Sequence, residues 1–232
     1  MLIVAHRGLH TTAPENSLGA VQAALAAGMA AMEVDVRAAG DGSLYLLHDA
    51  RLDRTSDGIG RLRVLDAAAA ARVRLADQTP LPTLDEVLAL AAGRAILCID
   101  VKEPDLGPAV LDAALHAGGA VEVWSTHREV VAAAADRGVM AALISHGVMP
   151  DGGVEALIDE ANQLGAGAIS FFPADVTPTV AHACAQRSMQ FMSGTPNDRA
   201  TWEQLTALGA RALITDRPLE CVAYAQAIGA AS

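Results

Sequence analysis

The chain has 232 residues, of which 52% are hydrophobic and only 3% aromatic, and its formal net charge is −11. So large an apolar fraction supports an extensive core built from small aliphatic side chains and excludes a disordered chain. The acidic charge disfavours binding of nucleic acids and stable insertion into anionic membranes. An anionic small molecule can therefore bind only where nearby cationic side chains or a metal ion make the local electrostatic potential positive.

Short β-branched runs alternate with alanine-rich segments of helical periodicity along the chain. The predicted strands cover residues 2–5, 31–36, 95–101, 121–125, 140–144, 168–171, 190–193 and 212–215. The predicted helices cover residues 17–27, 84–92, 107–117, 128–136, 153–164, 178–187, 199–207 and 219–228. Eight strands alternating with eight helices favour an α/β fold of the TIM (β/α)8 barrel type, with residues 1–232 as one domain.

Two insertions, together spanning about residues 37–82, interrupt this alternation after the second strand. Asp41 and Gly42 predict a two-residue hairpin turn, and the stretch that follows is polar and then rich in Ala and Arg. Segments that follow a barrel strand lie at the carboxyl ends of the strands, where active sites form. We therefore expect a β-hairpin and a short insertion at the mouth of the barrel.

Glu33 and Asp35 alternate along the second predicted strand, so their carboxylates project from the same face. Two carboxylates on one face of a buried strand repel each other unless a cation lies between them or one of them is protonated. A solvent-facing edge strand would remove this requirement. The apolar neighbours favour a buried strand, and we interpret the pair as metal ligands.

Two histidines are placed near these carboxylates by the predicted fold. If the chain folds back at a two-residue turn, His48 lies opposite Asp35 and shares its face, whereas a longer loop shifts the pairing by one or two residues. His6 ends the first strand at the same mouth. Because an imidazole exchanges protons near neutral pH, His6 and His48 can divide the roles of acid and base.

Arg7 and Gly8 follow His6 at the end of the first strand. A guanidinium suits bidentate contact with a phosphate, so Arg7 is a candidate phosphate-binding residue. Gly8 permits a close approach of the backbone to a ligand.

The third predicted strand ends in the sequence C-I-D-V-K, which places Cys98, Asp100 and Lys102 on one face. Asp100 can supply a third carboxylate to the metal and Lys102 a point positive charge for the phosphate, although a simple Asp–Lys ion pair is an alternative. A site of three carboxylates without cysteine selects a hard cation, Mg²⁺ or Ca²⁺, over Zn²⁺.

The three cysteines, Cys98, Cys184 and Cys221, are far apart and form no metal-type or redox-type pair. We expect reduced thiols packed in the core and a cytoplasmic protein. Residues 1–5 lead into a strand without the pattern of a signal peptide, and no apolar run has the length of a membrane span.

An ordered series of motifs makes the chain similar to the glycerophosphodiester phosphodiesterase family. The motifs are A-H-R-G at 5–8, P-E-N-S at 14–17, E-V-D-V at 33–36, D-G at 41–42, H-D at 48–49, L-D-R-T at 52–55, L-P-T-L-D-E-V at 81–87 and I-T-D-R-P at 214–218. The likeness spans most of the chain and is densest over residues 5–60. It implies a distorted TIM barrel that hydrolyses glycerophosphodiesters.

The resemblance also implies roles for individual residues. His6 and His48 correspond to the acid–base pair, Arg7 to the phosphate-binding arginine, and Glu33 and Asp35 to ligands of a divalent metal. Family members usually have a glutamate where this chain has Asp100, followed by a lysine like Lys102. The shorter Asp100 either ligates through a water molecule or draws the metal toward its strand.

Some departures from the family pattern concern the substrate. The family often has W-T-V-N at the seventh strand, whereas this chain has G-T-P-N at 194–197, so we expect a pocket without an aromatic wall. Two alternative functions remain. The chain could hydrolyse another diester, such as a lysophospholipid or a sugar phosphodiester, or it could be a non-catalytic barrel that binds a phosphorylated ligand.

The sequence does not decide whether the nucleophile is water or a neighbouring hydroxyl of the substrate. It also leaves the oligomeric state open.

Several polar residues near the same strand ends have simpler interpretations. We interpret His10 as a loop residue, and Asn16 and Ser17 as residues that begin and cap the first helix. Asp216 follows the last strand, where the sequence suits a helix-entry turn as well as a site at the mouth. His127 and His146 are near strand ends, and we interpret both as polar loop residues.

Overall fold

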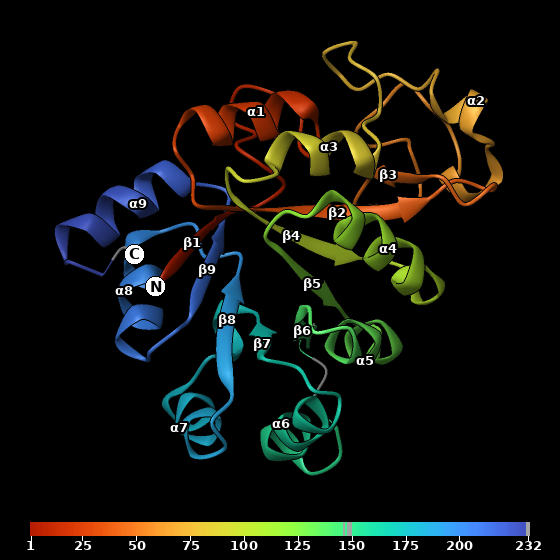
Figure 1. Cartoon of the computed structure of the whole chain (residues 1–232). Coiled ribbons are helices and arrows are strands. Elements are labelled where there is room, and N and C mark those ends of the chain that lie inside the picture. The colour runs from red at the N-terminus through yellow and green to blue at the C-terminus, as the bar shows by residue number, and fades with distance from the viewer. Residues whose placement is uncertain (146, 148–149, 231–232) are drawn as a thin grey trace.

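The computed structural model describes residues 1–145, 147 and 150–230, and its strands form a closed barrel (Figure 1). The parallel strands are β1 Leu2–Ala5, β2 Ala31–Ala38, β4 Ile96–Val101, β5 Val121–Ser125, β6 Met140–Ile144, β7 Ala168–Phe171, β8 Gln190–Gly194 and β9 Ala212–Thr215. Each strand pairs with the next, and β9 pairs with β1 to close the ring. The predicted TIM barrel is confirmed, and the predicted strands differ from these bounds by one or two residues at most.

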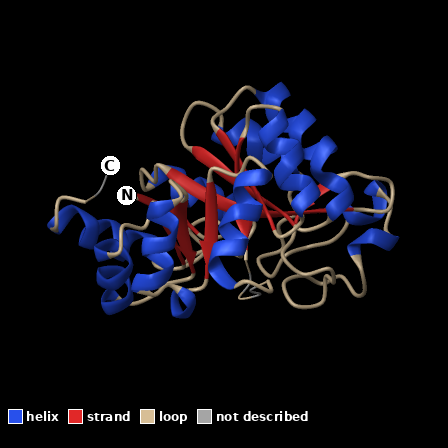
Figure 2. Cartoon of the chain, turned by 90° about the horizontal axis from the view of Figure 1, so that it is seen from below, coloured by secondary structure: helices blue, strands red, loops and turns tan. Residues whose placement is uncertain are grey.

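Helices surround the barrel on the outside of its strands (Figure 2). They are α1 Leu18–Ala26, α3 Leu84–Ala91, α4 Gly107–Ala117, α5 Arg128–Asp136, α6 Gly153–Gln163, α7 Pro178–Gln186, α8 Arg199–Ala207 and α9 Pro218–Ala227. All eight were predicted. The one-turn helix α2 Ala67–Ala70 and the 3-10 turns Leu62–Val64, Pro104–Leu106 and Pro173–Asp175 were not, because segments this short carry no hydrophobic period.

Two apolar cores hold the barrel together. The outer core lies between the strands and the helices, and Val34, Ile99 and Leu213 represent it. The inner core consists of mostly small side chains, namely Val4, Ala31, Cys98, Trp124, Ala142, Ala168, Met192, Ala212 and Ile214. Because so many of these residues are alanines, the indole of Trp124 fills much of the barrel centre. Its Nε1 donates to Glu122 Oε2 at 3.1 Å, and Glu122 pairs with Arg211 at the amino ends of the strands.

The state of the cysteines and the character of the helices can be compared with the sequence predictions. Cys98, Cys184 and Cys221 are buried free thiols, as predicted, and burial raises the pKa of each. Across the described residues, no helix has both the length and the apolar character that a membrane span requires.

The hairpin after β2 has a longer loop than predicted. The Ala39 N–H donates to the Ser43 carbonyl at 2.9 Å, so the loop has three residues, and Gly42 takes a φ of +90° that suits a left-handed loop position. Strand β3 Leu44–Leu46 therefore pairs Leu46 with Val36, and the predicted register is wrong by one residue. The Leu47 N–H still donates to the Asp35 carbonyl at 3.0 Å, and His48, two residues beyond the end of β3, lines the pocket at the mouth.

Gly8 allows the loop after β1 to pack on helix α1. Its φ is +79°, and a Cβ on Gly8 would lie 2.8 Å from the carbonyl carbon of Ala20 and 2.9 Å from the Ala20 Cβ. Gly8 is not among the pocket-lining residues. The close approach that the sequence suggested is therefore made to the helix, whose first turn follows the loop carrying Arg7.

We expect Gly8→Ala to lower the free energy of unfolding by about 2–4 kcal/mol, because it adds both backbone strain and a clash with Ala20. Urea denaturation measures this loss. Gly28→Ala is the matched control: Gly28 has a φ of +74° but nothing lies within 4 Å of its Cβ position, so only the strain of about 1–2 kcal/mol applies. Equal losses in the two variants would contradict the packing role.

Candidate functional site

All seven site residues predicted from the sequence line one pocket at the carboxyl ends of the strands. The pocket encloses about 670 Å³ out to its open mouth. Its lining consists of His6, Arg7, Glu33, Asp35, His48, Asp100, Lys102, Trp124, Ile144, Ser170, Phe171, Phe172, Gly194, Thr195 and Ile214. Residues of β2 and β4 and of the segments that follow β1, β3 and β4 supply its charged side.

Three carboxylates form the centre of this charged side. Glu33 and Asp35 lie on β2 and Asp100 lies on β4, and the exposed fractions of these residues are 3%, 1% and 8%. One oxygen from each lies within 4.8 Å of the other two. Asp100 is directly opposite Asp35 in the register of the two strands, which offsets its shorter side chain. Three buried oxygen donors at this spacing fit a hard divalent cation such as Mg²⁺ or Ca²⁺.

The charge of this cluster is only partly compensated by the protein. Lys102 Nζ lies 2.8 Å from Asp35 Oδ1 and also contacts Asp100. Burial, together with the charges of Asp35 and Asp100, raises the pKa of Glu33 well above its usual range. Burial opposes ionisation of Asp35 as well, but Lys102 and Arg7 hold its pKa at about 2. A bound cation would supply the positive charge that Glu33 needs to be ionised in this buried position.

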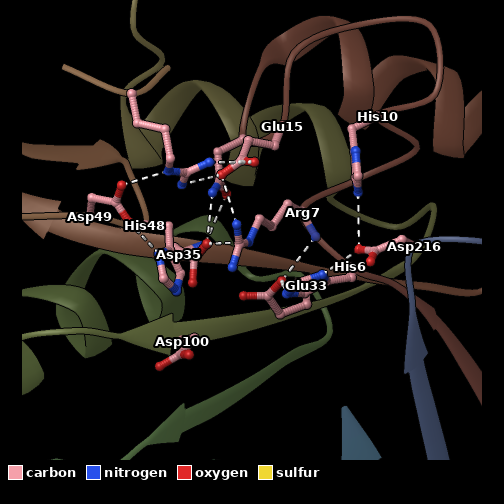
Figure 3. A network of polar contacts seen from close by, with 12 residues as sticks. His6, Arg7, His10, Glu15, Glu33, Asp35, His48, Asp49, Asp100 and Asp216 are labelled. Atoms are coloured by element: carbon pink, nitrogen blue, oxygen red, sulfur yellow. Dashed lines mark hydrogen bonds and ion pairs between the residues drawn. The ribbon is translucent and has the colours of Figure 1, made fainter. Parts of the chain in front are cut away.

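Arg7 contacts two of these carboxylates through a left-handed backbone with a φ of 55°. Its backbone N–H donates to Glu33 Oε2 at 2.9 Å, and its Nε lies 3.1 Å from Asp35 Oδ2. Its Nη1 also donates to Glu15 Oε1 at 2.8 Å (Figure 3). The uncommon φ thus lets one residue contact the cluster with both its main chain and its side chain.

Of the two residues predicted to cap the first helix, Ser17 is confirmed, whereas Asn16 orients Asp35 instead. The cap of α1 is Ser17, whose hydroxyl accepts from the Ala20 N–H. Asn16 is buried and has a φ of 55°, and its Nδ2 donates to Asp35 Oδ2 at 2.7 Å. Its Oδ1 accepts from the Asp35 N–H at 3.0 Å. The P-E-N motif was the available signal for this contact.

Asp216 orients His6, a role that the sequence left open. The two residues directly follow the neighbouring strands β1 and β9, and His6 Nδ1 lies 2.6 Å from Asp216 Oδ1 (Figure 3). Hydrogen bonds from His10 and His6 hold the pKa of Asp216 well below its usual range. The carboxylate is therefore the acceptor and Nδ1 the donor. His6 Nε2 faces the cluster, 4.0 Å from Glu33 Oε2.

Asp49 makes the corresponding contact to His48. His48 Nδ1 lies 2.7 Å from Asp49 Oδ1, and Asp49 Oδ2 accepts from Arg54 Nε at 2.6 Å. The hydrogen bond from Arg54 is the main cause that holds the pKa of Asp49 at about 2. Arg54 also donates to both oxygens of Glu15, at 3.0 and 2.8 Å. Because Glu15 in turn binds Arg7, one chain of contacts joins the insertion to the loop after β1.

The opposite wall of the pocket is aromatic, so the prediction of a pocket without an aromatic wall is wrong. Gly194 of β8 supplies no ring, as the sequence indicated, but Trp124 of β5, Phe171 of β7 and Phe172, which follows β7, line the pocket. Phe172 is 45% exposed and lies at the rim. The sequence comparison looked only at the seventh barrel strand, and the rings come from the fourth and the sixth.

His127, which the sequence also places near a strand end, is not part of the described pocket lining. His127 Nε2 lies 3.2 Å from the Lys102 carbonyl oxygen, which agrees with its interpretation as a polar loop residue. His146 lies outside the described residues.

Comparisons with known proteins agree on one family. Residues 6–110 match the model of the glycerophosphoryl diester phosphodiesterase family. The chain is 25% identical over 233 aligned positions to a glycerophosphodiester phosphodiesterase of Caldanaerobacter subterraneus, covering 94% of each protein. It is 40% identical over 95 residues to the bovine glycerophosphodiester phosphodiesterase 1, which corresponds to 37% of this chain and 29% of the bovine protein.

The fold has close counterparts among solved structures. An Oleispira antarctica phosphodiesterase, solved in complex with the product sn-glycerol-3-phosphate, superposes with a TM-score of 0.87 at 20% identity and covers 97% of each chain. The likeness in fold therefore extends over almost the whole chain, well beyond the segment matched to the bovine protein.

Proposed function

Because the chain belongs to the glycerophosphoryl diester phosphodiesterase family, we propose that it hydrolyses glycerophosphodiesters to glycerol phosphate and an alcohol in a metal-dependent reaction. The observation that carries this proposal is the pocket in which Glu33, Asp35 and Asp100 lie beside His6 and His48. Residues 1–232 act as one catalytic unit in this proposal, because Arg54 of the insertion contacts Glu15 of the loop after β1.

Glu33, Asp35 and Asp100 would hold the cation, and their all-oxygen donor set suits Mg²⁺ or Ca²⁺. When bound there, a divalent cation neutralises negative charge on the phosphodiester, which otherwise repels a nucleophile. Arg7 and Lys102 border the cluster and would donate hydrogen bonds to the phosphate oxygens. The protein thus supplies both the ligands for the cation and two fixed positive charges.

His6 and His48 would exchange the two protons that the reaction requires. One imidazole accepts a proton from the nucleophile, water or a glycerol hydroxyl, and the other donates a proton to the leaving alkoxide. Asp216 and Asp49 each hold the Nδ1 of one ring, at 2.6 and 2.7 Å, which directs the proton exchange to Nε2. Nδ1 of both rings is thus held by a carboxylate, which leaves Nε2 of one ring to accept a proton and Nε2 of the other to donate one.

Hydrolysis of a chromogenic phosphodiester and of glycerophosphocholine, each with and without EDTA, tests the proposed function. We expect turnover of both substrates and release of glycerol phosphate from the second. A barrel that only binds a phosphorylated ligand would bind glycerol phosphate but release no product. Turnover of lysophospholipids at a higher kcat/KM than glycerophosphocholine would favour the alternative substrate.

We expect modest discrimination among leaving alcohols. The kcat/KM values for glycerophosphodiesters of choline, ethanolamine and glycerol should agree within about 1–3 kcal/mol, because a few apolar contacts discriminate no more than this. Choline should be favoured, since an aromatic ring such as Phe172 attracts a quaternary ammonium group by about 0.5–1 kcal/mol at an exposed site.

Steady-state kinetics on the three diesters measures this preference. Phe172→Ala should remove the advantage of choline, and Phe172→Tyr, which keeps a ring, should retain it. A preference beyond about a thousand-fold for any one diester would contradict this prediction, as would an advantage of choline that survives Phe172→Ala.

A further inference from the structure

A second group of potential metal ligands lies on the far side of His6 from the carboxylate cluster. His6, His10 and Asp216 each offer one ligand atom, and these atoms lie within 4.8 Å of one another. His6 Nδ1 is 2.6 Å and His10 Nε2 is 3.2 Å from the same oxygen, Asp216 Oδ1 (Figure 3). The side chains are 19%, 26% and 34% exposed, so an ion has access to them from solvent.

The carboxylate of this group is fixed by neighbours that are not ligands. Asn197 Nδ2 donates to Asp216 Oδ2 at 2.7 Å, which leaves Oδ1 directed at the two imidazoles. Asn197 Oδ1 in turn accepts from the Asp216 N–H and from Thr215 Oγ1, both at 2.9 Å. In metal sites, hydrogen bonds from residues that do not touch the ion orient the carboxylate ligands in this way. The pairing of β1 with β9 sets the distance between His6 and Asp216.

We propose that His6, His10 and Asp216 form an inhibitory site for Zn²⁺ or a similar borderline ion. Two imidazole nitrogens and one carboxylate oxygen are the donor set that Zn²⁺ prefers, whereas the all-oxygen set of Glu33, Asp35 and Asp100 suits hard cations. The chain therefore presents two sites of different chemical selectivity on two sides of one histidine. The inhibitory effect, though not the binding, rests on the acid–base role proposed for His6.

Little movement is needed to admit the ion. Zn–N and Zn–O bonds of about 2.0–2.2 Å place neighbouring ligands of a tetrahedral site about 3.3 Å apart. The contacts of 2.6 and 3.2 Å to Asp216 Oδ1 therefore open by less than about 1 Å. His10 lies in the loop between β1 and α1, which can take up this change, and a water molecule would complete the four ligands.

Binding would reverse the tautomer of His6. An imidazole nitrogen that binds an ion carries no proton, so the single proton that the neutral ring carries on Nδ1 is released to solvent, and the ring takes up one proton from solvent on Nε2. The Nε2 that faces the carboxylate cluster can then no longer accept a proton. The Asp216 carboxylate would at the same time bind the ion instead of accepting a hydrogen bond from His6. Zn²⁺ would thus inhibit without displacing the cation of the carboxylate cluster.

The binding experiment uses Zn²⁺ alone, competed against a chromophoric chelator at about pH 8 in excess Mg²⁺. We expect one Zn²⁺ per chain in the wild type and at least about ten-fold weaker binding in His10→Ala, His10→Gln and Asp216→Ala. Glu33→Gln should keep the site, because Glu33 belongs to the other cluster. His182→Ala is the control, since His182 is exposed on α7 and contacts Gln186. Unchanged Zn²⁺ affinity in both His10 variants would overturn the proposal.

The inhibition experiment compares each variant with its own rate in Mg²⁺. Zn²⁺ should inhibit the wild type and His182→Ala at the same concentration, and His10→Ala should require at least about ten-fold more. Equal inhibition in His10→Ala would show that Zn²⁺ acts at the carboxylate cluster instead. A chain that hydrolyses no diester would contradict the proposed function, while the binding experiment would still decide whether the zinc site exists.

Discussion

Excess EDTA is expected to abolish hydrolysis by the wild-type protein, and added Mg²⁺ or Ca²⁺ to restore it. Glu33→Gln and Asp35→Asn should each lower kcat/KM by at least about a thousand-fold, since loss of the cation removes several kcal/mol of charge stabilisation. Both substitutions keep the shape of the side chain. The Arg7 N–H, 2.9 Å from Glu33, therefore keeps an acceptor, and the loss reports the metal rather than the fold.

A graded series at the third ligand sharpens this test. Asp100→Ala should weaken the affinity for Mg²⁺, whereas Asp100→Glu, which restores the residue usual in the family, should retain activity. Asp112→Ala is the control, because Asp112 is 70% exposed on α4 and pairs only with a surface arginine, Arg137, among the contacts described. Full activity in excess chelator, or in Glu33→Gln, would contradict metal dependence.

His6→Ala and His48→Ala are each expected to lower kcat by about a hundred-fold or more, the effect of losing a proton-transfer group. The KM for the diester should change less, because Arg7 and Lys102 are proposed to hold the phosphate. Both imidazoles are partly exposed, at 19% and 35%, so the variants should unfold at nearly the wild-type temperature.

The histidine experiment includes His116→Ala as a control for loss of an imidazole from the surface of α4. This variant should keep the wild-type kcat. If either His6→Ala or His48→Ala turned over substrate at a rate near that of the wild type, the acid–base role of that residue would be wrong. If both did, the reaction would require a different proton acceptor in the pocket.

Local patterns predicted most of the fold because each barrel strand and helix has its own hydrophobic period. The meeting of Glu33, Asp35 and Asp100 in one cluster could also be predicted, since they lie on strands whose alternation decides which face they occupy. The register of the hairpin was predicted wrongly because a single added loop residue changes every pair. The three-residue loop is visible only in the structure, in the hydrogen bond between Ala39 and Ser43 and in the pairing of Val36 with Leu46.

The contacts that orient the site residues were not predictable in the same way. Asp216 is 210 positions from His6, and the two meet only because β9 closes the barrel against β1. Asn16 reaches Asp35 through a left-handed backbone that no periodicity reveals. Such partners meet only when the barrel closes, so the sequence shows them as single residues of a motif without indicating what they contact.

The small side chains inside the barrel have an optical consequence. Trp124 is one of two tryptophans in the chain, and its indole both fills the barrel centre and lines the pocket. The other, Trp202, is buried in the outer core and donates to the Pro196 carbonyl, away from that lining. With Trp202 replaced by phenylalanine, the fluorescence of the chain would come from a single indole at the pocket. Occupancy by a cation or a slow substrate analogue then becomes visible as a change in emission, without any turnover.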